Sequence, residues 1–186
     1  MAVELAIRDG AVLRPYGDAD APELTALVAT NREHLAPWMP WAATHGHQDS
    51  VEFVRRMRAQ IEAEEGFEGA VVVAGEIVGG AGFHAVDRLN RSTSIGYWLA
   101  ADAQGTGLMT ATVRALLDHA FGAWALHRVV IEAVVDNARS RAIPERLGFT
   151  EEGVLRDAKR VRGRYEDAAL YAMLAPDWQR SPASSA

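Results

Sequence analysis

The sequence of 186 residues contains no cysteine, which excludes disulfides, thiol nucleophiles and zinc sites built on thiolates. No apolar run approaches the ~18 residues of a membrane helix, and Met1 to Pro15 lacks the apolar core of a signal peptide. A net charge of −6 provides no cationic excess for unspecific binding to nucleic acid or to an anionic membrane. These absences predict a soluble, cytoplasmic protein with neither nucleic acid nor membrane as a partner.

What the chain does contain is the composition of an ordinary globular protein, with 49% apolar and 24% charged residues. A chain of this length can build one compact domain with a core and is too short for two. We therefore expect a single domain over residues 1–178. The last residues are mostly small and polar, so we expect residues 179–186 to form a disordered tail.

The hydrophobic pattern predicts helices interspersed among strands along the chain. Strand-like runs cover residues 11–15, 70–74, 77–83, 94–99, 127–135, 152–160 and 165–174. Helix-like runs follow Asp18 and Asp49 and also cover residues 108–121 and 137–147. This order predicts an α/β (α+β) protein with a mixed central sheet of about six to seven strands flanked by about four helices.

Three of these elements carry local signals. Asp18 suits the N-cap of the first helix, and Asp49 with Glu52 fits a capping box for the second. The run His127–Val135 is nearly continuous in apolar and β-branched residues, which is typical of a central strand covered on both faces.

A glycine-containing loop, Asp102–Thr110, lies between the strand at 94–99 and the helix at 108–121. Gly105 and Gly107 allow a ligand to approach the backbone closely, because neither residue has a Cβ. The helix start adds unpaired N–H groups and the positive end of the helix dipole. The loop is therefore a candidate site for a phosphate or pyrophosphate, although a simple turn gives the same pattern.

Several motifs in order resemble the GNAT superfamily of N-acyltransferases, and within it the branch that includes the RimJ and RimL ribosomal-protein N-terminal acetyltransferases. These motifs are Trp38–Trp41, Ile95–Leu99, Gln104–Thr110, Asn137–Ser140, Glu145–Phe149 and Tyr165–Leu174. The resemblance covers roughly residues 13–178 and implies the GNAT fold. It also implies acetyl-CoA as co-substrate, a primary amine as acceptor and no metal.

The resemblance also assigns cofactor contacts. It implies that loop N–H groups hold the pyrophosphate, that a splay beside the strand at 94–99 admits the pantetheine arm, and that Asn137 bonds this arm. The cofactor-binding candidates are Trp98, Leu99, Gln104, Gly105, Thr106, Gly107, Leu108, Met109, Thr110 and Asn137. Met109 departs from the family's commoner Gly or Ala. Arg139, Arg141 and Arg146 could face the adenosine phosphate or be solvated helix charges.

The reaction that the resemblance implies is direct attack of the amine on the thioester. Ser140 matches the residue assigned in this branch as the acid that protonates the thiolate, and it also suits a helix N-cap. Pro144 offers no N–H to the carbonyl of Ser140, so the helix either starts near Ser140 or kinks there.

The general base departs from the family pattern. Lys159 stands where this branch often has a glutamate. Strand alternation puts Asp157 on the same face, either as a substitute base or as the ion-pair partner of Lys159. Glu132, His84 and Asp87 are more distant candidates. A site without a strong base favours an α-amine with a pKa near ~8 over a lysine amine near ~10.4.

Some residues have two interpretations. With Arg160 and Arg162, Lys159 suits an acidic acceptor or a donor such as succinyl-CoA, or is simply a solvated strand edge. Trp38 and Trp41 line the acceptor pocket or pin their loop to the core.

A second group of residues has a structural interpretation. His45, His47 and Asp49 are residue types that bind metals, but a surface loop in which Asp49 caps the following helix is the favoured interpretation. Tyr97, Trp98 and Tyr171 read as sheet packing.

The prediction is thus an acetyl-CoA-dependent N-acetyltransferase that acts on a protein N-terminal α-amine or a small-molecule amine, and that can form a homodimer. The alternatives are a CoA-binding protein without turnover and a nucleotide-binding protein that uses the same loop. The latter lacks a P-loop Gly-Lys-Ser/Thr ending and the third glycine of a dinucleotide fingerprint.

Overall fold

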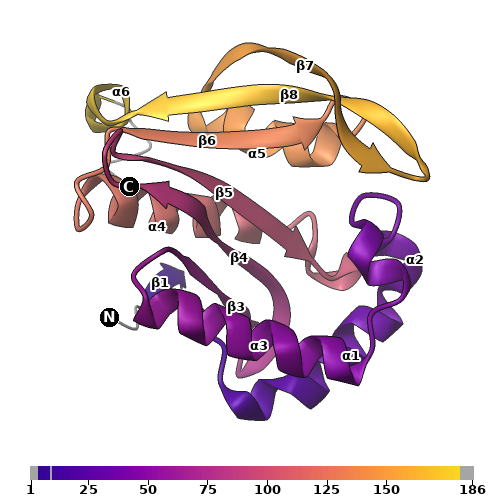
Figure 1. Cartoon of the computed structure of the whole chain (residues 1–186). Coiled ribbons are helices and arrows are strands. Elements are labelled where there is room, and N and C mark those ends of the chain that lie inside the picture. The colour runs from indigo at the N-terminus through magenta and orange to yellow at the C-terminus, as the bar shows by residue number, and fades with distance from the viewer. Residues whose placement is uncertain (1–3, 9, 181–186) are drawn as a thin grey trace.

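The computed structural model describes residues 4–8 and 10–180, and most of the expected tail, residues 181–186, lies outside them. One sheet of eight strands forms its centre, in the order β1-β2-β3-β4-β5-β6-β8-β7 (Figure 1). The strands are β1 (Leu5–Arg8), β2 (Ala11–Pro15), β3 (Phe67–Val73), β4 (Glu76–Asp87), β5 (Ser92–Leu99), β6 (Arg128–Val134), β7 (Thr150–Val161) and β8 (Arg164–Leu174). Strands β5 and β6 are parallel and the other neighbours are antiparallel, so the sheet is mixed.

The helices of the described chain are α1 (Ala21–Thr30), α2 (Arg32–Leu35), α3 (His47–Glu62), α4 (Leu108–Phe121), α5 (Ala138–Leu147) and α6 (Ala175–Arg180). Short 3-10 turns cover Asp18–Asp20 (η1), Pro40–Ala43 (η2) and Ala101–Ala103 (η3). Within the described ranges, no helix combines the length and the apolar character needed to cross a bilayer.

The predicted fold class is confirmed, but the expected numbers of strands and helices were too low. The unexpected elements are β1, α2 and α6. Strand β1 and helix α2 are each 4 residues long, and α6 has 6 residues and ends at Arg180, inside the expected tail. Elements this short span too few residues for a periodic hydrophobic pattern, so sequence periodicity does not detect them.

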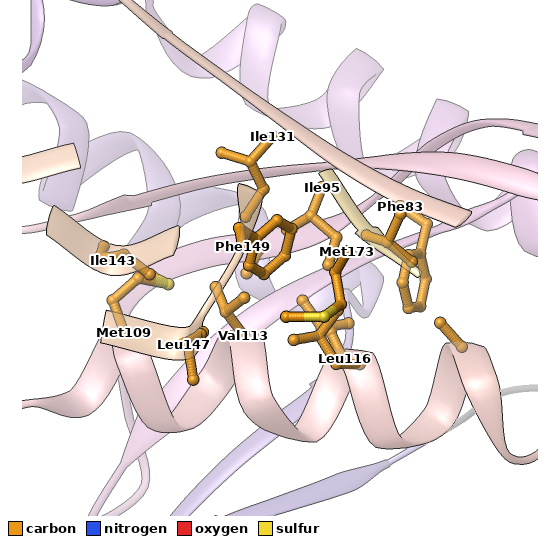
Figure 2. Packing of buried hydrophobic residues seen from close by; sticks show 14 of the residues in the cluster. Phe83, Ile95, Met109, Val113, Leu116, Ile131, Ile143, Leu147, Phe149 and Met173 are labelled. Atoms are coloured by element: carbon orange, nitrogen blue, oxygen red, sulfur yellow. The ribbon is translucent and has the colours of Figure 1, made fainter. Parts of the chain in front are cut away.

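Two layers of helices cover the sheet, because alternate side chains of each strand point to opposite faces. On one face, Val113 and Leu116 of α4 pack with Ile95 of β5 in the larger apolar cluster, to which α5 also contributes (Figure 2). On the other face, Val72 of β3 and Trp98 of β5 belong to the cluster beneath α1 and α3. Strand β5 therefore contributes side chains to both layers.

The start of α1 differs from the prediction. The 3-10 turn η1 precedes the helix, and Asp20, not Asp18, accepts a hydrogen bond from the backbone N–H of Gly17 at 2.7 Å. Asp18 instead pairs with Arg58 of α3. The prediction of Asp18 as the N-cap is wrong because η1 moves the start of the α-helix to Ala21.

The start of α3 also lies earlier than predicted. Gly46 is its N-cap, so Asp49 lies in the first turn and accepts a hydrogen bond from the Gly46 N–H at 2.8 Å. The predicted capping box of Asp49 with Glu52 is wrong by three positions. The structural role of Asp49 is confirmed, since it satisfies one of the N–H groups at the helix entry.

Candidate active site

The parallel strands β5 and β6 separate part of the way along their length. Their register pairs Ser92 with Arg128, Thr93 with Val129 and Ser94 with Val130. Beyond Ser94, β5 remains paired with β4 as far as Leu99 but no longer with β6, and Figure 1 shows the two strands diverging toward α2. The predicted splay is confirmed. The edge of β5 at Trp98 and Leu99 is thus available to pair with an extended, amide-rich ligand.

The separation leaves part of β6 uncovered. Ile131 and Ala133 are buried, but Glu132 between them is exposed. The expectation that β6 is covered on both faces is therefore wrong. Its open face borders a cavity instead of a layer of helix.

A groove of about 1220 Å³, here called the loop groove, runs from the glycine loop to the first turn of α5. Gly105 and Gly107 adopt φ values of 76° and 77°, a region that favours glycine, and Gly107 is the N-cap of α4. The predicted cofactor residues line the groove, except Thr106. The carbonyl of Thr106 accepts a hydrogen bond from the guanidinium Nη1 of Arg8 at 2.9 Å, and its hydroxyl accepts one from Nη2.

The three candidate arginines of α5 have different roles. Arg139 and Arg146 line the loop groove, and Arg139 donates to the side chain of Gln104 at 3.1 Å. Arg141 does not line the groove. It donates to the hydroxyl of Tyr171 at 2.8 Å and lies 3.4 Å from Glu151. Arg141 is therefore held by Tyr171 and Glu151 outside the groove, so Arg139 and Arg146 are the better placed candidates for a phosphate.

Helix α5 begins in a way that the sequence only partly indicates. Asn137 is its N-cap, and its Oδ1 accepts a hydrogen bond from the Ser140 N–H at 3.2 Å. The alternative role of Ser140 as the N-cap is thus wrong. The helix is continuous through Pro144, which leaves the carbonyl of Ser140 without an intrahelical donor.

The hydroxyl of Tyr97 supplies the missing donor. It donates to the carbonyl of Ser140 at 2.9 Å and lies 3.3 Å from the Ser140 Oγ, which donates to it. Burial raises the pKa of Tyr97 to about 12, so the phenol stays protonated at neutral pH. Tyr97 therefore does more than pack in the sheet, because it fixes the first turn of α5 against β5.

A second cavity of about 700 Å³, here called the tryptophan cavity, lies on the α3 side of the splay. Trp38, Trp41 and Trp98 line it, with the Trp41 and Trp98 rings edge to face at 6.0 Å. The guanidinium of Arg162 lies over the indole of Trp38, with its Cζ 4.6 Å from the centre of the indole ring. Both loop tryptophans thus border an accessible space, and Trp41 remains 43% exposed.

The two cavities share one border. The residues that line both are Trp38, Met39, Tyr97, Trp98, Asn137 and Ser140. Tyr97 and Ser140 are hydrogen-bonded to each other at this border. A ligand in the loop groove and a ligand in the tryptophan cavity would therefore meet beside the hydroxyl groups of Tyr97 and Ser140.

An ion pair and an imidazole–carboxylate contact lie in the tryptophan cavity. The Nζ of Lys159 is 2.7 Å from Oε2 of Glu132, and Nε2 of His84 is 3.3 Å from Oε2 of Glu68. Glu132 is therefore the partner of Lys159. Of the three cations in the proposed wall, Lys159 and Arg162 have carboxylate partners, since Arg162 contacts Glu166 at 3.3 Å, and Arg160 also lines the cavity.

Asp157 does not reach this cavity. Its φ of 52° and the shift in pairing between Leu155 and Lys159 show a bulge that interrupts the alternation of β7. Asp157 is exposed, and its N–H donates to Asp167 at 2.9 Å. The prediction that Asp157 shares a face with Lys159 is wrong for this reason. Asp87 is also outside the cavity and accepts hydrogen bonds from Asn90 in a turn.

The metal-like residues near α3 have other partners. Nε2 of His45 lies 2.8 Å from the Ser50 hydroxyl, and Nδ1 of His47 lies 3.4 Å from the hydroxyl of Thr25. Among residues 4–8 and 10–180, His, Asp and Glu side chains form no group of three suited to a metal.

Sequence reasoning missed His34, which lines the loop groove, and Arg8, which binds the glycine loop at Thr106. Arg8 lies on the four-residue strand β1, and His34 in α2 contacts Gln104 at 2.7 Å. Both belong to elements too short to be recognised, and both are distant in sequence from the loop. Only the three-dimensional arrangement reveals them.

Comparison with known proteins agrees with this geometry. A sequence model described as the acetyltransferase (GNAT) domain matches residues 11–150. YdaF of Bacillus subtilis (strain 168), provisionally assigned as a ribosomal N-acetyltransferase, is 34% identical over 175 residues, which are 93% of this chain and 96% of that protein.

Two solved structures with bound ligands are also similar. The microcin C7 self-immunity acetyltransferase MccE, in complex with acetyl-CoA and AMP, has a TM-score of 0.85 and 30% identity over 90% of this chain and 94% of its own. RimL, a ribosomal L7/L12 α-N-protein acetyltransferase in complex with coenzyme A, has a TM-score of 0.89 and 26% identity over 95% of this chain and 99% of its own.

Proposed function

Because this chain belongs to the GNAT acetyltransferase family and is an acetyl-CoA-dependent N-acetyltransferase, we propose that its acceptor is the α-amine of a protein N-terminus. The observation that carries this proposal is the shared border of the two cavities at Tyr97 and Ser140. The loop groove would hold the donor and the tryptophan cavity would hold the acceptor. Ribosomal proteins are the acceptor class that the names of YdaF and RimL suggest.

The donor would bind mainly to backbone groups. The N–H groups of residues 105–110 at the start of α4 suit the pyrophosphate, and the edge of β5 at Trp98 and Leu99 suits the amides of the pantetheine arm. Arg139 and Arg146 line the same groove and can neutralise the remaining phosphate charge. Asn137, at the border of both cavities, can contact the arm where it approaches the acceptor.

Transfer then needs three changes. The neutral amine attacks the carbonyl carbon of the thioester, the C–S bond breaks, and the sulfur takes a proton. The Ser140 hydroxyl is our candidate for giving a proton to that sulfur, after which it regains a proton from solvent. Tyr97 would position it, since its protonated phenol binds the carbonyl and the hydroxyl of the same residue.

The proton of the amine has a candidate acceptor in His84. This imidazole lines the tryptophan cavity and is held against Glu68, whereas the Glu132 carboxylate already binds the Lys159 ammonium. An α-amine with a pKa near ~8 is about one-tenth neutral at pH 7, so it needs less help from a base than a lysine side chain does. This difference favours N-termini as acceptors.

The acidic donor suggested by Lys159 is less favoured than acetyl-CoA. Lys159 is paired with Glu132 at 2.7 Å and Arg162 with Glu166, so these two cations already have carboxylate partners. Arg160, which also lines the cavity, is the remaining candidate to bind a donor carboxylate. Acetyl-CoA is the co-substrate that the family supports.

A homodimer and a cytoplasmic location remain predictions. Exposed Val154 and Leu155 on the edge strand β7 favour the dimer, which sedimentation would test.

The test is thiol release from acetyl-CoA with matched peptides. One set has free N-termini that begin with Ser or Ala and contains no lysine, and the other has blocked N-termini and one internal lysine. We expect turnover with the first set and at least about tenfold less with the second, because the lysine amine is mostly charged. Preference for the lysine peptides, or for succinyl-CoA as donor, would overturn the proposal.

A further inference from the structure

Lys159 is the single lysine of the whole sequence, and every other basic side chain except histidine is arginine. A guanidinium stays protonated and is a poor nucleophile, whereas a lysine amine can be acetylated. The surface of this acetyltransferase thus offers one acetylatable side chain. That side chain lies in the tryptophan cavity, where the acceptor amine is expected.

The position of Lys159 also matches that of an acceptor. Its Nζ is 2.7 Å from Oε2 of Glu132, which is within reach for direct proton transfer. The same cavity is bordered by Tyr97 and Ser140, the two residues that also face the loop groove. The four-carbon stem of lysine is flexible and the side chain is 43% exposed, so Nζ is free to leave Glu132 and move within the cavity that Tyr97 and Ser140 border.

We propose that the enzyme acetylates its own Lys159 when acetyl-CoA is bound and no acceptor occupies the tryptophan cavity. The inference rests on the proposed placement of donor and acceptor. Nζ gives one proton to the Glu132 carboxylate and attacks the thioester carbonyl carbon. The N–C bond forms as the C–S bond breaks, and the CoA sulfur takes the second proton from the nitrogen. Glu132 then releases its proton to water, so one acetyl-CoA yields one acetyl-lysine and one CoA.

The modification would change how the cavity receives an acceptor. Acetyl-lysine carries no charge, so Glu132 loses the cation that it binds in the free enzyme. The carboxylate is then free to attract the α-ammonium of an incoming N-terminus. Self-acetylation therefore lowers the KM for the acceptor and leaves the KM for acetyl-CoA unchanged.

The test incubates the enzyme with acetyl-CoA alone and follows acetylation at each site by peptide mass spectrometry, which separates Lys159 from the chain's own N-terminus. An internal standard comes from R156K, because Arg156 is exposed on the same strand and lines neither cavity. We expect Lys159 to be modified about tenfold faster than the substituted lysine at position 156, because its donor is bound beside it. Its rate should saturate with acetyl-CoA, fall with excess CoA and not depend on enzyme concentration.

The outcomes separate the two proposals. Equal rates at positions 159 and 156, or a rate that CoA does not inhibit, would mean ordinary chemical acetylation and would overturn self-acetylation. Normal turnover of an N-terminal peptide with Lys159 unmodified would overturn it while leaving the proposed function intact. Absence of both reactions would count against the proposed function itself. K159R, which keeps the cation beside Glu132, should lose the modification and the fall in acceptor KM.

Discussion

The loop groove and the tryptophan cavity meet at Tyr97 and Ser140 but are built in different ways. The loop groove depends on backbone: two glycines with positive φ, the first turn of α4 and the unpaired edge of β5. The tryptophan cavity depends on side chains from α3, β3, β4, β5, β6, β7 and the segment before α3, among them the Lys159–Glu132 ion pair and the His84–Glu68 contact. A donor that never changes suits fixed backbone groups, whereas an acceptor site can be altered one side chain at a time.

The largest effect is expected where the two cavities meet. S140A removes the hydroxyl but keeps the carbonyl that Tyr97 binds. Loss of the proposed proton donor to the thiolate should lower kcat about 100-fold without changing the KM for acetyl-CoA. Steady-state kinetics with an N-terminal peptide measures both constants. An unchanged kcat would remove Ser140 from the mechanism and leave it as a helix residue only.

Tyr97 gives the next effect, in stability at alkaline pH. Burial raises its pKa to about 12, whereas an unfolded tyrosine titrates near ~10. Between these values the unfolded chain binds fewer protons than the folded chain, so stability is full below pH ~10 and falls as the pH rises. The loss approaches about 2 kcal/mol at pH 12. Comparing urea midpoints at pH 8 and pH 11, Y97F should show a smaller fall than the wild type.

The matched control for Y97F is Y165F, because Tyr165 is 64% exposed. Y165F should keep the full alkaline fall of the wild type. Some fall should persist in Y97F, since burial also raises the pKa of Tyr16. Identical alkaline behaviour of Y97F and Y165F would show that Tyr97 is not held neutral at the border of the two cavities.

A backbone change should affect the loop groove selectively. Gly107 and Gly75 both have positive φ and open space where a Cβ would lie, but only Gly107 borders the groove. G107A and G75A should each lose about 1 kcal/mol of stability from left-handed strain. If loop geometry binds the pyrophosphate, G107A alone should also raise the KM for acetyl-CoA, by about fivefold. A similar rise in G75A would indicate a general effect of destabilisation.

The contrast between the two cavities also explains which parts of the site could be predicted from the sequence and which could not. The glycine loop at one end of the loop groove was predicted as a phosphate site from one continuous stretch, because its glycines and helix start lie within nine residues, Asp102–Thr110. Pro144 indicated that the carbonyl of Ser140 lacks a helical donor, but nothing in the sequence identifies Tyr97 as its replacement. The pair of Lys159 with Glu132 was missed because the bulge at Asp157 cannot be seen in an alternating pattern.

The smallest expected effect concerns Arg8, a side chain from outside the glycine loop that contacts the loop without lining the loop groove. Arg8 of β1 donates to the carbonyl and hydroxyl of Thr106, and so braces the loop between the two glycines. R8Q should raise the KM for acetyl-CoA about twofold, the scale of one exposed charge-assisted contact. R88Q, which removes another exposed arginine, paired with Glu64, is the control and should leave this KM unchanged. Because Arg8 adds positive charge near the proposed pyrophosphate site, the difference between R8Q and wild type should shrink at high salt. A difference that salt does not alter would mean that Arg8 acts only by shaping the loop.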